Sequence, residues 1–180
     1  SPAPVVDGRM HRTIMERIIE PTVAGLAADG IDYQGFLYAG VMIDADGNPY
    51  VLEYNCRLGD PETQPILMRL QSDLLELLDA TIDRRLNEIL AQWDPRTAMS
   101  VVMASGGYPG DYENGHVVQG LDDQPLASDV RVFHAGTISG PDGIRTNGGR
   151  VLSVCALGDT VTKARSLVYE RISSISWQGA

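Results

Sequence analysis

The stretch VLEYNCRLGDPET, residues 51–63, begins with the composition of a β-strand and ends as a loop rich in charged side chains. Side chains two positions apart on a strand point to the same face of the sheet. Glu53 and Asn55 are therefore expected to project together, and a carboxylate beside an amide oxygen is a ligand pair that Mg²⁺ accepts. For this pair alone, a solvated sheet edge is the alternative interpretation.

The loop after this strand strengthens the prediction of a functional site. Arg57 supplies a planar donor for phosphate or carboxylate, and the Gly-Asp-Pro-Glu turn at residues 59–62 adds two carboxylates. Surface loops seldom combine a guanidinium and two carboxylates within so few residues. We therefore expect the functional site at the end of this strand.

Composition and charge narrow the class of protein. A chain of 180 residues that is 43% hydrophobic can bury one good core or two small ones. The formal charge is −10, the excess of acidic residues lies almost entirely in residues 1–94, and Lys163 is the single lysine among 14 basic residues. This balance argues against nucleic acid and anionic membranes as partners. Any phosphate must be bound by a few arginines, glycine-rich backbone and a metal.

The termini and the cysteines suggest where the protein works. No apolar run approaches the roughly 20 residues of a membrane helix. The chain starts Ser-Pro-Ala-Pro without an initiator methionine, so we expect a cut within a longer chain or a processed end. Cys56 and Cys155 form neither a disulfide framework nor a zinc motif, which favours a reducing compartment such as the cytoplasm.

The N-terminal half predicts a helix followed by a hairpin. Apolar residues at helical spacing predict a helix over residues 9–29, which Asp7 can cap and Pro21 should kink or split. Two apolar segments, 33–43 and 49–55, flank an Asp-Gly turn and predict an antiparallel hairpin. Within its first strand, Gly35 and Gly40 allow either close approach of a ligand or backbone, or a β-bulge.

Two more helices are predicted after the loop. A short helical turn can begin at Gln64-Pro65 and run through Leu70. Ser72 should then cap a helix of about twenty residues whose regular apolar stripe predicts core packing, with its charges on the solvated face. This helix should end at residues 93–96, where we place the boundary between two domains.

The second half predicts a small, mostly antiparallel sheet. Short apolar segments alternate with glycine turns, and a closing helix follows that Asp159 or Thr160 can cap. The predicted strands are 98–104, 116–119, 130–135 and 150–156.

Three glycine-rich segments of this half are candidate sites: 105–110, 134–137 and 146–150. Gly148 and Gly149 offer backbone N–H groups beside the Arg150 guanidinium, a combination that can bind phosphate. Ordinary turns are the alternative for these glycines. Of the scattered histidines, only His134 merits attention as a functional residue.

Five segments together resemble one family. They are YAGVM at 38–42, VLEYNCRLGDPETQP at 51–65, GGYPG at 106–110, FHAGT at 133–137 and TNGGRVL at 146–152. In this order they resemble the phosphoribosylamine–glycine ligases, or glycinamide ribonucleotide synthetases, a family of ATP-grasp enzymes. The resemblance covers essentially the whole chain. The Arg-Leu-Gly-Asp-Pro-Glu segment is specific to the family, whereas Glu-x-Asn is shared with ATP-grasp enzymes generally.

The resemblance implies an α+β fold in two domains. Residues 1–94 would be the C-terminal lobe of an ATP-grasp domain, an antiparallel sheet with flanking helices that forms half of the ATP-grasp core. Residues 95–180 would be the family's C-terminal domain, a small, mostly antiparallel β domain with a closing helix.

The resemblance also implies a reaction of de novo purine synthesis. ATP phosphorylates the glycine carboxylate, and the amine of 5-phosphoribosylamine attacks the acyl phosphate to give glycinamide ribonucleotide, ADP and phosphate. Glu53 and Asn55 would hold Mg²⁺ or Mn²⁺, and Arg57 would face phosphate or the glycine carboxylate. Asp60 and Glu62 would receive the ammonium group of glycine or orient the attacking amine.

Further residues would complete the substrate site. In the loop at residues 56–63, which we call the signature loop, these are Gly59, Pro61 and Thr63. On the ribose-phosphate side they are Gly148, Gly149 and Arg150.

Two departures from the superfamily pattern predict an incomplete enzyme. Many ATP-grasp enzymes carry another carboxylate ligand on the preceding strand, where this chain has residues 39–41, Ala-Gly-Val. The phosphate-binding lysines of the upstream lobe are also absent, because Lys163 lies on the closing helix. We expect the chain to need the N-terminal part of the same enzyme, to bind ATP weakly or not at all by itself, and not to turn over alone. The rival interpretations are another ATP-grasp carboxylate–amine ligase and a non-catalytic binding domain that keeps the fold.

Overall fold

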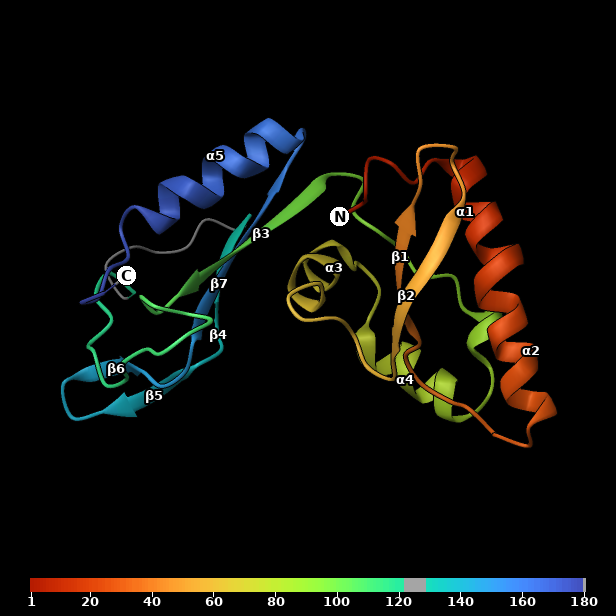
Figure 1. Cartoon of the computed structure of the whole chain (residues 1–180), viewed down its shortest axis with the longest axis horizontal. Coiled ribbons are helices and arrows are strands. Elements are labelled where there is room, and N and C mark those ends of the chain that lie inside the picture. The colour runs from red at the N-terminus through yellow and green to blue at the C-terminus, as the bar shows by residue number, and fades with distance from the viewer. Residues whose placement is uncertain (122–128, 180) are drawn as a thin grey trace. The chain divides into compact units, whose positions relative to one another are not determined.

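The computed structural model describes residues 1–121 and 129–179 and has a mixed α+β fold (Figure 1). Its contacts divide the chain into two units. The N-terminal unit comprises Pro2–Asp60 and Leu70–Trp93, and the C-terminal unit comprises Ser1, Pro61–Arg69 and Asp94–Ala180. The division between Trp93 and Asp94 lies where the sequence suggests a boundary, but the segment Pro61–Arg69 belongs to the C-terminal unit. The domain ranges 1–94 and 95–180 therefore stay a prediction.

The first helix of the N-terminal unit is continuous but changes its winding before Pro21. It consists of α1 (Gly8–Ile14), a π-helical turn (Met15–Ile19) and α2 (Glu20–Ala28). The Asp7 carboxylate accepts hydrogen bonds from the first backbone N–H groups, as predicted. Proline has no N–H, and its ring clashes with the carbonyl four residues earlier. The wider π turn accommodates this ring without breaking the helix, so the expected split is a local change of pitch.

The predicted hairpin is confirmed, with a shorter first strand. Strand β1 (Tyr38–Ile43) pairs antiparallel with β2 (Pro49–Asn55), and the hairpin lies beside the α1–α2 helix (Figure 1). The register shifts after Gly40, which lies opposite Glu53, whereas the next residue of β1 lies opposite Val51. Leu52 is therefore the extra residue of a β-bulge, which was one of the two interpretations of Gly40.

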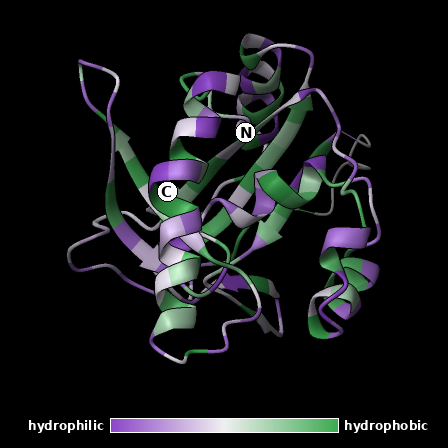
Figure 2. Cartoon of the chain, turned by 90° about the vertical axis from the view of Figure 1, so that its right-hand side faces the viewer, coloured by the Kyte–Doolittle hydropathy of each residue, from purple (hydrophilic) through white to green (hydrophobic). Residues whose placement is uncertain are grey.

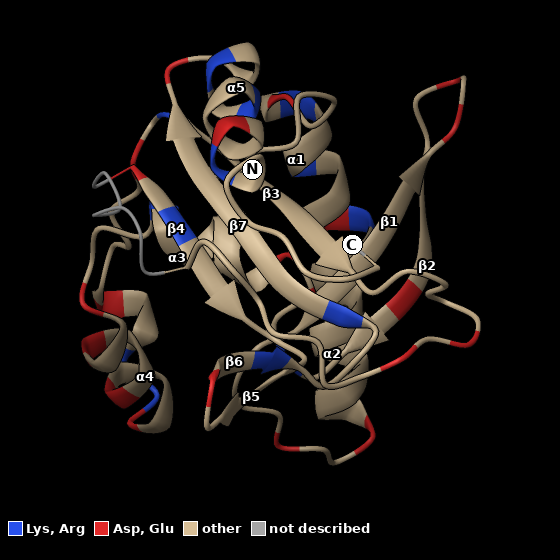
Figure 3. Ribbon diagram, turned by 90° about the vertical axis from the view of Figure 1, so that its left-hand side faces the viewer, with Lys and Arg blue, Asp and Glu red and all other residues tan. Residues whose placement is uncertain are grey.

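The long helix predicted from Ser72 is wrong in length, in cap and in burial. Helix α4 spans only Leu74–Ile82 and is capped by Asp73, whose carboxylate accepts from the Leu75 N–H at 2.8 Å. Arg84 then takes a positive φ of 59°, and this backbone conformation ends the helix before a short 3₁₀ turn at Leu86–Glu88. The Arg84 guanidinium pairs with Asp32. Figure 3 shows acidic residues along α4. The apolar stripe is not core in this unit, because several of its members are exposed: Leu75, Ile82 and Leu86.

The C-terminal unit is built on a three-stranded antiparallel sheet. Strand β7 (Arg150–Gly158) lies between β3 (Thr97–Ala104) and β4 (Val130–His134). Helix α5 (Val161–Ile172) packs on this sheet and is capped by Thr160, whose hydroxyl accepts from the Lys163 N–H. The fully buried side chains of β7 and α5 form the core: Val151, Leu152, Val154, Ala156, Ala164 and Val168.

Two features of the C-terminal unit differ from the predicted strands. The segment predicted as a strand at 116–119 forms only isolated bridges, from Val117 to Arg145 and from Gln119 to Ser176. An additional hairpin was not predicted, with β5 (Thr137–Gly140) paired to β6 (Gly143–Thr146). The predicted short helix is α3 (Thr63–Arg69), which belongs to this unit. Within residues 1–121 and 129–179, no helix combines the length and apolarity needed to cross a membrane.

Candidate functional site

Glu53 and Asn55 project from the same face of β2, as their spacing predicts. The amide Nδ2 of Asn55 donates a hydrogen bond to Oε1 of Glu53 at 3.1 Å. Across the hairpin, Gly40 lies opposite Glu53, and a Cβ at Gly40 would approach the Glu53 Cγ to 3.1 Å. The glycine therefore leaves room for the Glu53 side chain, which is exposed to solvent.

This pair offers a metal two oxygen-bearing side chains and little more. Among the residues that the structure describes, no group of three or more histidine, cysteine, aspartate or glutamate residues could hold a metal ion. Mg²⁺ commonly takes one or two carboxylates and completes its octahedron with water and substrate phosphates. Glu53 and Asn55 fit such an ion, with most of its ligands supplied from outside the protein, once the Asn55 amide turns its oxygen towards it.

The signature loop begins in one unit and ends in the other. Arg57 is exposed, and its Nη1 donates to the neighbouring Leu58 carbonyl at 2.8 Å. Asp60 is the last residue of this loop in the N-terminal unit, whereas Glu62 already belongs to the C-terminal unit. The Glu62 carbonyl accepts the Ile66 N–H at 3.2 Å and so opens helix α3. The two carboxylates of this predicted turn thus belong to different units of the fold.

An ionic network fixes the far end of α3. The Arg69 Nε donates to the Asp94 carbonyl at 2.9 Å, and the Asp94 N–H donates to the Arg69 carbonyl at 2.7 Å. The Asp94 carboxylate pairs with Arg96 at 2.7 Å, and Arg96 also pairs with Asp129 at 3.0 Å. Hydrogen bonds from Arg96 hold the pKa of the Asp94 carboxyl below its usual value. The helix that follows the signature loop is therefore anchored to the start of β3.

The three glycine-rich segments meet at one end of the β3–β7–β4 sheet. Ser105 donates from its backbone N–H to the Gly149 carbonyl at 2.8 Å and from its hydroxyl to the Gly148 carbonyl at 3.0 Å. Gly136 joins the same place, because its carbonyl accepts the Asn147 N–H at 2.7 Å. These segments are far apart in the sequence, and their convergence was not predicted.

Packing explains the glycines at this junction. A Cβ at Gly149 would overlap the ring of Tyr108, and a Cβ at Gly136 would lie 2.8 Å from the Gly148 Cα. Two of the local carbonyls are already bonded to Ser105. Close packing is therefore one reason for the glycines at this junction. The assignment of Gly148, Gly149 and Arg150 to a ribose phosphate stays a prediction. His134 contacts the Thr137 hydroxyl through Nδ1 at 3.0 Å.

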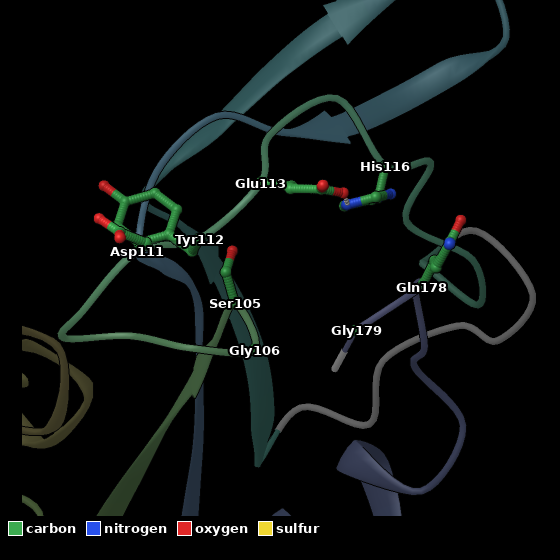
Figure 4. Close-up of a pocket in the computed structure, with 8 residues that line it drawn as sticks. All are labelled: Ser105, Gly106, Asp111, Tyr112, Glu113, His116, Gln178 and Gly179. Carbon is green, nitrogen blue, oxygen red and sulfur yellow. Dashed lines mark ion pairs between the residues drawn. The ribbon is translucent and has the colours of Figure 1, made fainter.

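Sequence reasoning missed a cavity of about 430 Å³ in the C-terminal unit. Asp111, Tyr112 and Glu113 contribute to its wall together with His116 (Figure 4). The available signal was the run Asp-Tyr-Glu directly after a glycine-rich turn. From the sequence, His116 is interpreted as an ordinary residue because the three histidines are scattered, although its partner Glu113 lies only three residues away.

Two domain models of a single family match the chain. The phosphoribosylglycinamide synthetase ATP-grasp (A) domain matches residues 1–63, and the phosphoribosylglycinamide synthetase C domain matches residues 98–180. The match to the A domain includes Glu53 and Asn55, and the match to the C domain includes the glycine-rich junction.

Relatives named phosphoribosylamine–glycine ligase align with the whole chain. The Allochromatium vinosum protein is 60% identical over 180 residues, which is 100% of this chain and 42% of the relative. The Vibrio cholerae protein is 55% identical over 179 residues, which is 99% of this chain and again 42% of the relative. The chain therefore spans less than half the length of these relatives.

Solved structures agree with the sequence matches. The crystal structure of phosphoribosylamine–glycine ligase from Thermotoga maritima has a TM-score of 0.75 at 32% identity, covering 99% of this chain and 42% of that one. The biotin carboxylase subunit of pyruvate carboxylase has a TM-score of 0.65 at 14% identity, covering 100% of this chain and 39% of that one, and shows the fold alone. The chain belongs to the phosphoribosylglycinamide synthetase family, of which it carries part of the ATP-grasp domain and the C domain.

Proposed function

We propose that this chain is part of an ATP-dependent ligase that joins glycine to 5-phosphoribosylamine. The observation that carries the proposal is 60% identity along all 180 residues to a protein named phosphoribosylamine–glycine ligase. In this reaction a glycine carboxylate oxygen attacks the γ-phosphorus of ATP and ADP leaves. The amine then attacks the carbonyl carbon of the glycyl phosphate, phosphate leaves, and the new C–N bond gives glycinamide ribonucleotide.

The side chains of β2 and the signature loop suit the first of these steps. Phosphoryl transfer is catalysed mainly by positioning and by neutralising charge on the phosphate oxygens. Glu53 and Asn55 would hold Mg²⁺ or Mn²⁺, which supplies that neutralisation when bound. Arg57 follows two residues later and would bind a phosphate or the glycine carboxylate through its planar donors.

The remaining loop residues suit the amine-bearing substrates. Asp60 and Glu62 carry the carboxylates that would receive the glycine ammonium group or orient the attacking amine. Gly59, Pro61 and Thr63 would shape the substrate-binding loop around them. We assign the ribose-phosphate side to Gly148, Gly149 and Arg150.

The unit that carries Glu53 depends on a partner to complete this site. Of its described aliphatic and aromatic side chains, proline aside, only Ile18 and Ala80 are buried. The single lysine, Lys163, lies on α5 of the other unit. We propose that the rest of the same enzyme supplies the missing apolar contacts and the phosphate-binding lysines, and that the complete protein works in the cytoplasm.

Reconstitution tests the reaction and the metal pair together. The chain is joined to, or mixed with, the remaining part of a relative, and ADP release is followed with phosphoribosylamine and either glycine or alanine. We expect turnover that requires glycine and that falls by roughly a hundredfold or more in Glu53→Gln. Glu76→Gln, which changes an exposed carboxylate on α4 of the same unit, is the matched control and should leave turnover unchanged.

Each arm of this experiment can contradict a separate statement. Equal turnover with alanine would exclude glycine as the specific substrate. Unchanged turnover in Glu53→Gln would exclude that residue as a metal ligand. For the chain alone, calorimetry with Mg-ATP should detect no tight binding, and a sub-micromolar Kd would show that the nucleotide site is already complete.

A further inference from the structure

The cavity of about 430 Å³ in the C-terminal unit has the size of a small-molecule site. It lies entirely within one unit, and its wall is formed by residues between 105 and 116 together with the C-terminal tail. The glycine-rich turn, the adjoining acidic segment, the isolated bridge segment and the C-terminal tail contribute Ser105, Gly106, Asp111, Tyr112, Glu113, His116, Gln178 and Gly179.

Polar side chains surround the opening of this cavity. In Figure 4, Ser105, Glu113, His116 and Gln178 lie around one open space. The Nε2 of His116 lies 3.6 Å from Oε2 of Glu113, and the His116 backbone N–H donates to the Thr146 hydroxyl at 3.2 Å. These contacts hold a carboxylate and an imidazole side by side at the rim.

The hydroxyl of Ser105 offers an acceptor inside the cavity wall. Ser105 is only 5% exposed, and its hydroxyl proton is used in the bond to the Gly148 carbonyl. The lone pairs of the same oxygen remain able to accept a hydrogen bond. The buried side of the wall therefore favours a ligand that donates hydrogen bonds.

The charge of the wall points to the same kind of ligand. Asp111 and Glu113 bring two carboxylates, and no lysine or arginine is among the eight lining residues. A phosphate or carboxylate ligand would be repelled by this set. A cation is attracted by both carboxylates, and no lysine or arginine among the lining residues repels it.

Two aromatic rings pack together beside the cavity. The Tyr112 ring lies 6.2 Å from that of Tyr108, measured between centroids, with an interplanar angle of 60°. Tyr108 in turn packs on Gly149, where no side chain fits. In Figure 4 the Tyr112 ring points away from the space that Ser105, Glu113 and His116 surround, so this pair supports the wall.

The backbone parts of the wall are held in place before any ligand binds. The Gly106 N–H donates to the Gly179 carbonyl at 2.5 Å, which ties the glycine-rich turn to the C-terminal tail. A Cβ at Gly106 would overlap that carbonyl, so the close approach requires a glycine. A wall that is already ordered loses less conformational entropy on binding.

We propose that this cavity binds a small organic cation that carries an ammonium group. Glu113 binds the charge, Asp111 adds to the negative potential of the wall, and the Ser105 hydroxyl accepts one of the N–H donors of the ligand. Neither β2 nor the loop that follows it contributes to the cavity.

The test is a charge series of ligands of equal length, followed by two-dimensional NMR of the amide groups. The probes are 1,4-diaminobutane, 1,4-butanediol and succinate, each titrated into the millimolar range at constant ionic strength. We expect saturable shifts of the Gly106 and Gly179 amides with the diamine alone. The Val154 amide, in the buried strand β7 and outside the cavity, should not shift.

Variants decide whether the carboxylates make the selection. The double change Asp111→Asn and Glu113→Gln should weaken diamine binding roughly tenfold or more. Glu170→Gln on α5 removes a carboxylate outside the cavity and should leave the affinity unchanged. Unshifted amides of β7 in each variant show that the core is intact. Equal binding of the diol, an unchanged affinity in the double variant, or no saturable shift with the diamine would each overturn the proposal.

Discussion

The two units of this chain differ in where their apolar side chains lie. In the C-terminal unit, α5 and the central strand β7 contribute most of the buried apolar residues, and Leu152 and Val168 have no exposed surface. In the N-terminal unit, apolar residues of the hairpin and of α4 face solvent, with Leu52 65% and Leu75 69% exposed. Helix α2 is mostly apolar in Figure 2, yet none of its residues is buried.

This contrast distinguishes a self-contained unit from an incomplete one. Contiguous exposed apolar surface on a protein normally marks an interface. The C-terminal unit satisfies its own core, whereas the N-terminal unit keeps its secondary structure through the hairpin and the helix caps. The following changes test the contrast.

The largest difference is expected for leucine truncations. Leu152→Ala removes a fully buried side chain of β7 and should lower the free energy of opening of that strand by about 3 kcal/mol. Leu90→Ala, at a side chain that is 81% exposed, should change the opening of its own unit by less than about 0.5 kcal/mol. Amide hydrogen exchange measures both in one experiment. Equal losses would show that the N-terminal unit has a core of its own.

Glycine-to-alanine changes should have opposite signs in the two units. Gly149→Ala places a methyl group against the Tyr108 ring and should destabilise the C-terminal unit by about 1–3 kcal/mol. Gly25→Ala lies in α2, where nothing is within 4 Å of the new Cβ, and should stabilise that helix by about 0.5–1 kcal/mol. Hydrogen exchange of β7 and of α2 reports each change. A destabilising Gly25→Ala would reveal a packed neighbour on α2.

Helix caps should show how far a local change spreads. Thr160→Ala removes the bond to the Lys163 N–H and should lower the stability of α5 and of the sheet beneath it by about 1 kcal/mol. Asp73→Ala removes the bond to the Leu75 N–H with a similar local cost. We expect the second effect to stay within α4. Faster exchange in β1 and β2 of Asp73→Ala would show that the N-terminal unit unfolds cooperatively.

Features set by neighbouring residues could be predicted from the sequence. The turn that contains Asp46-Gly47 joins β1 to β2. The Asp44 carboxylate stabilises this turn, because it accepts hydrogen bonds from the backbone N–H groups of Asp46 and Asn48. Strand periodicity placed the side chains of Glu53 and Asn55 together for the same reason. The β5–β6 hairpin was also available, since its Pro-Asp-Gly turn at 141–143 is a turn signal that we did not use.

Features set by distant residues could not be predicted in this way. The end of α4 depends on Arg84 pairing with Asp32, which lies far away in the sequence. The regular stripe of α4 predicts burial, but Leu75, Ile82 and Leu86 of this stripe are exposed. The convergence of Ser105, Gly136 and Gly148 likewise follows from strand order, which apolar periodicity does not specify.

The smallest effect should be a difference in acid sensitivity. Hydrogen bonds from Arg96 lower the pKa of Asp94 in the folded protein below its usual value. The ionised carboxylate therefore contributes stability above the unfolded pKa of roughly 3.9, and this contribution is lost as the pH falls through the folded pKa.

Asp94→Asn should lower the stability of the C-terminal unit at neutral pH and flatten its decline below pH of about 4. The loss of stability should be modest because Arg96 keeps its pair with Asp129. Urea unfolding at several pH values measures this loss. The fluorescence of the buried Trp177, in a Trp93→Phe background, reports the unfolding. An acid transition as steep in Asp94→Asn as in the parent would assign the pH dependence to other carboxylates.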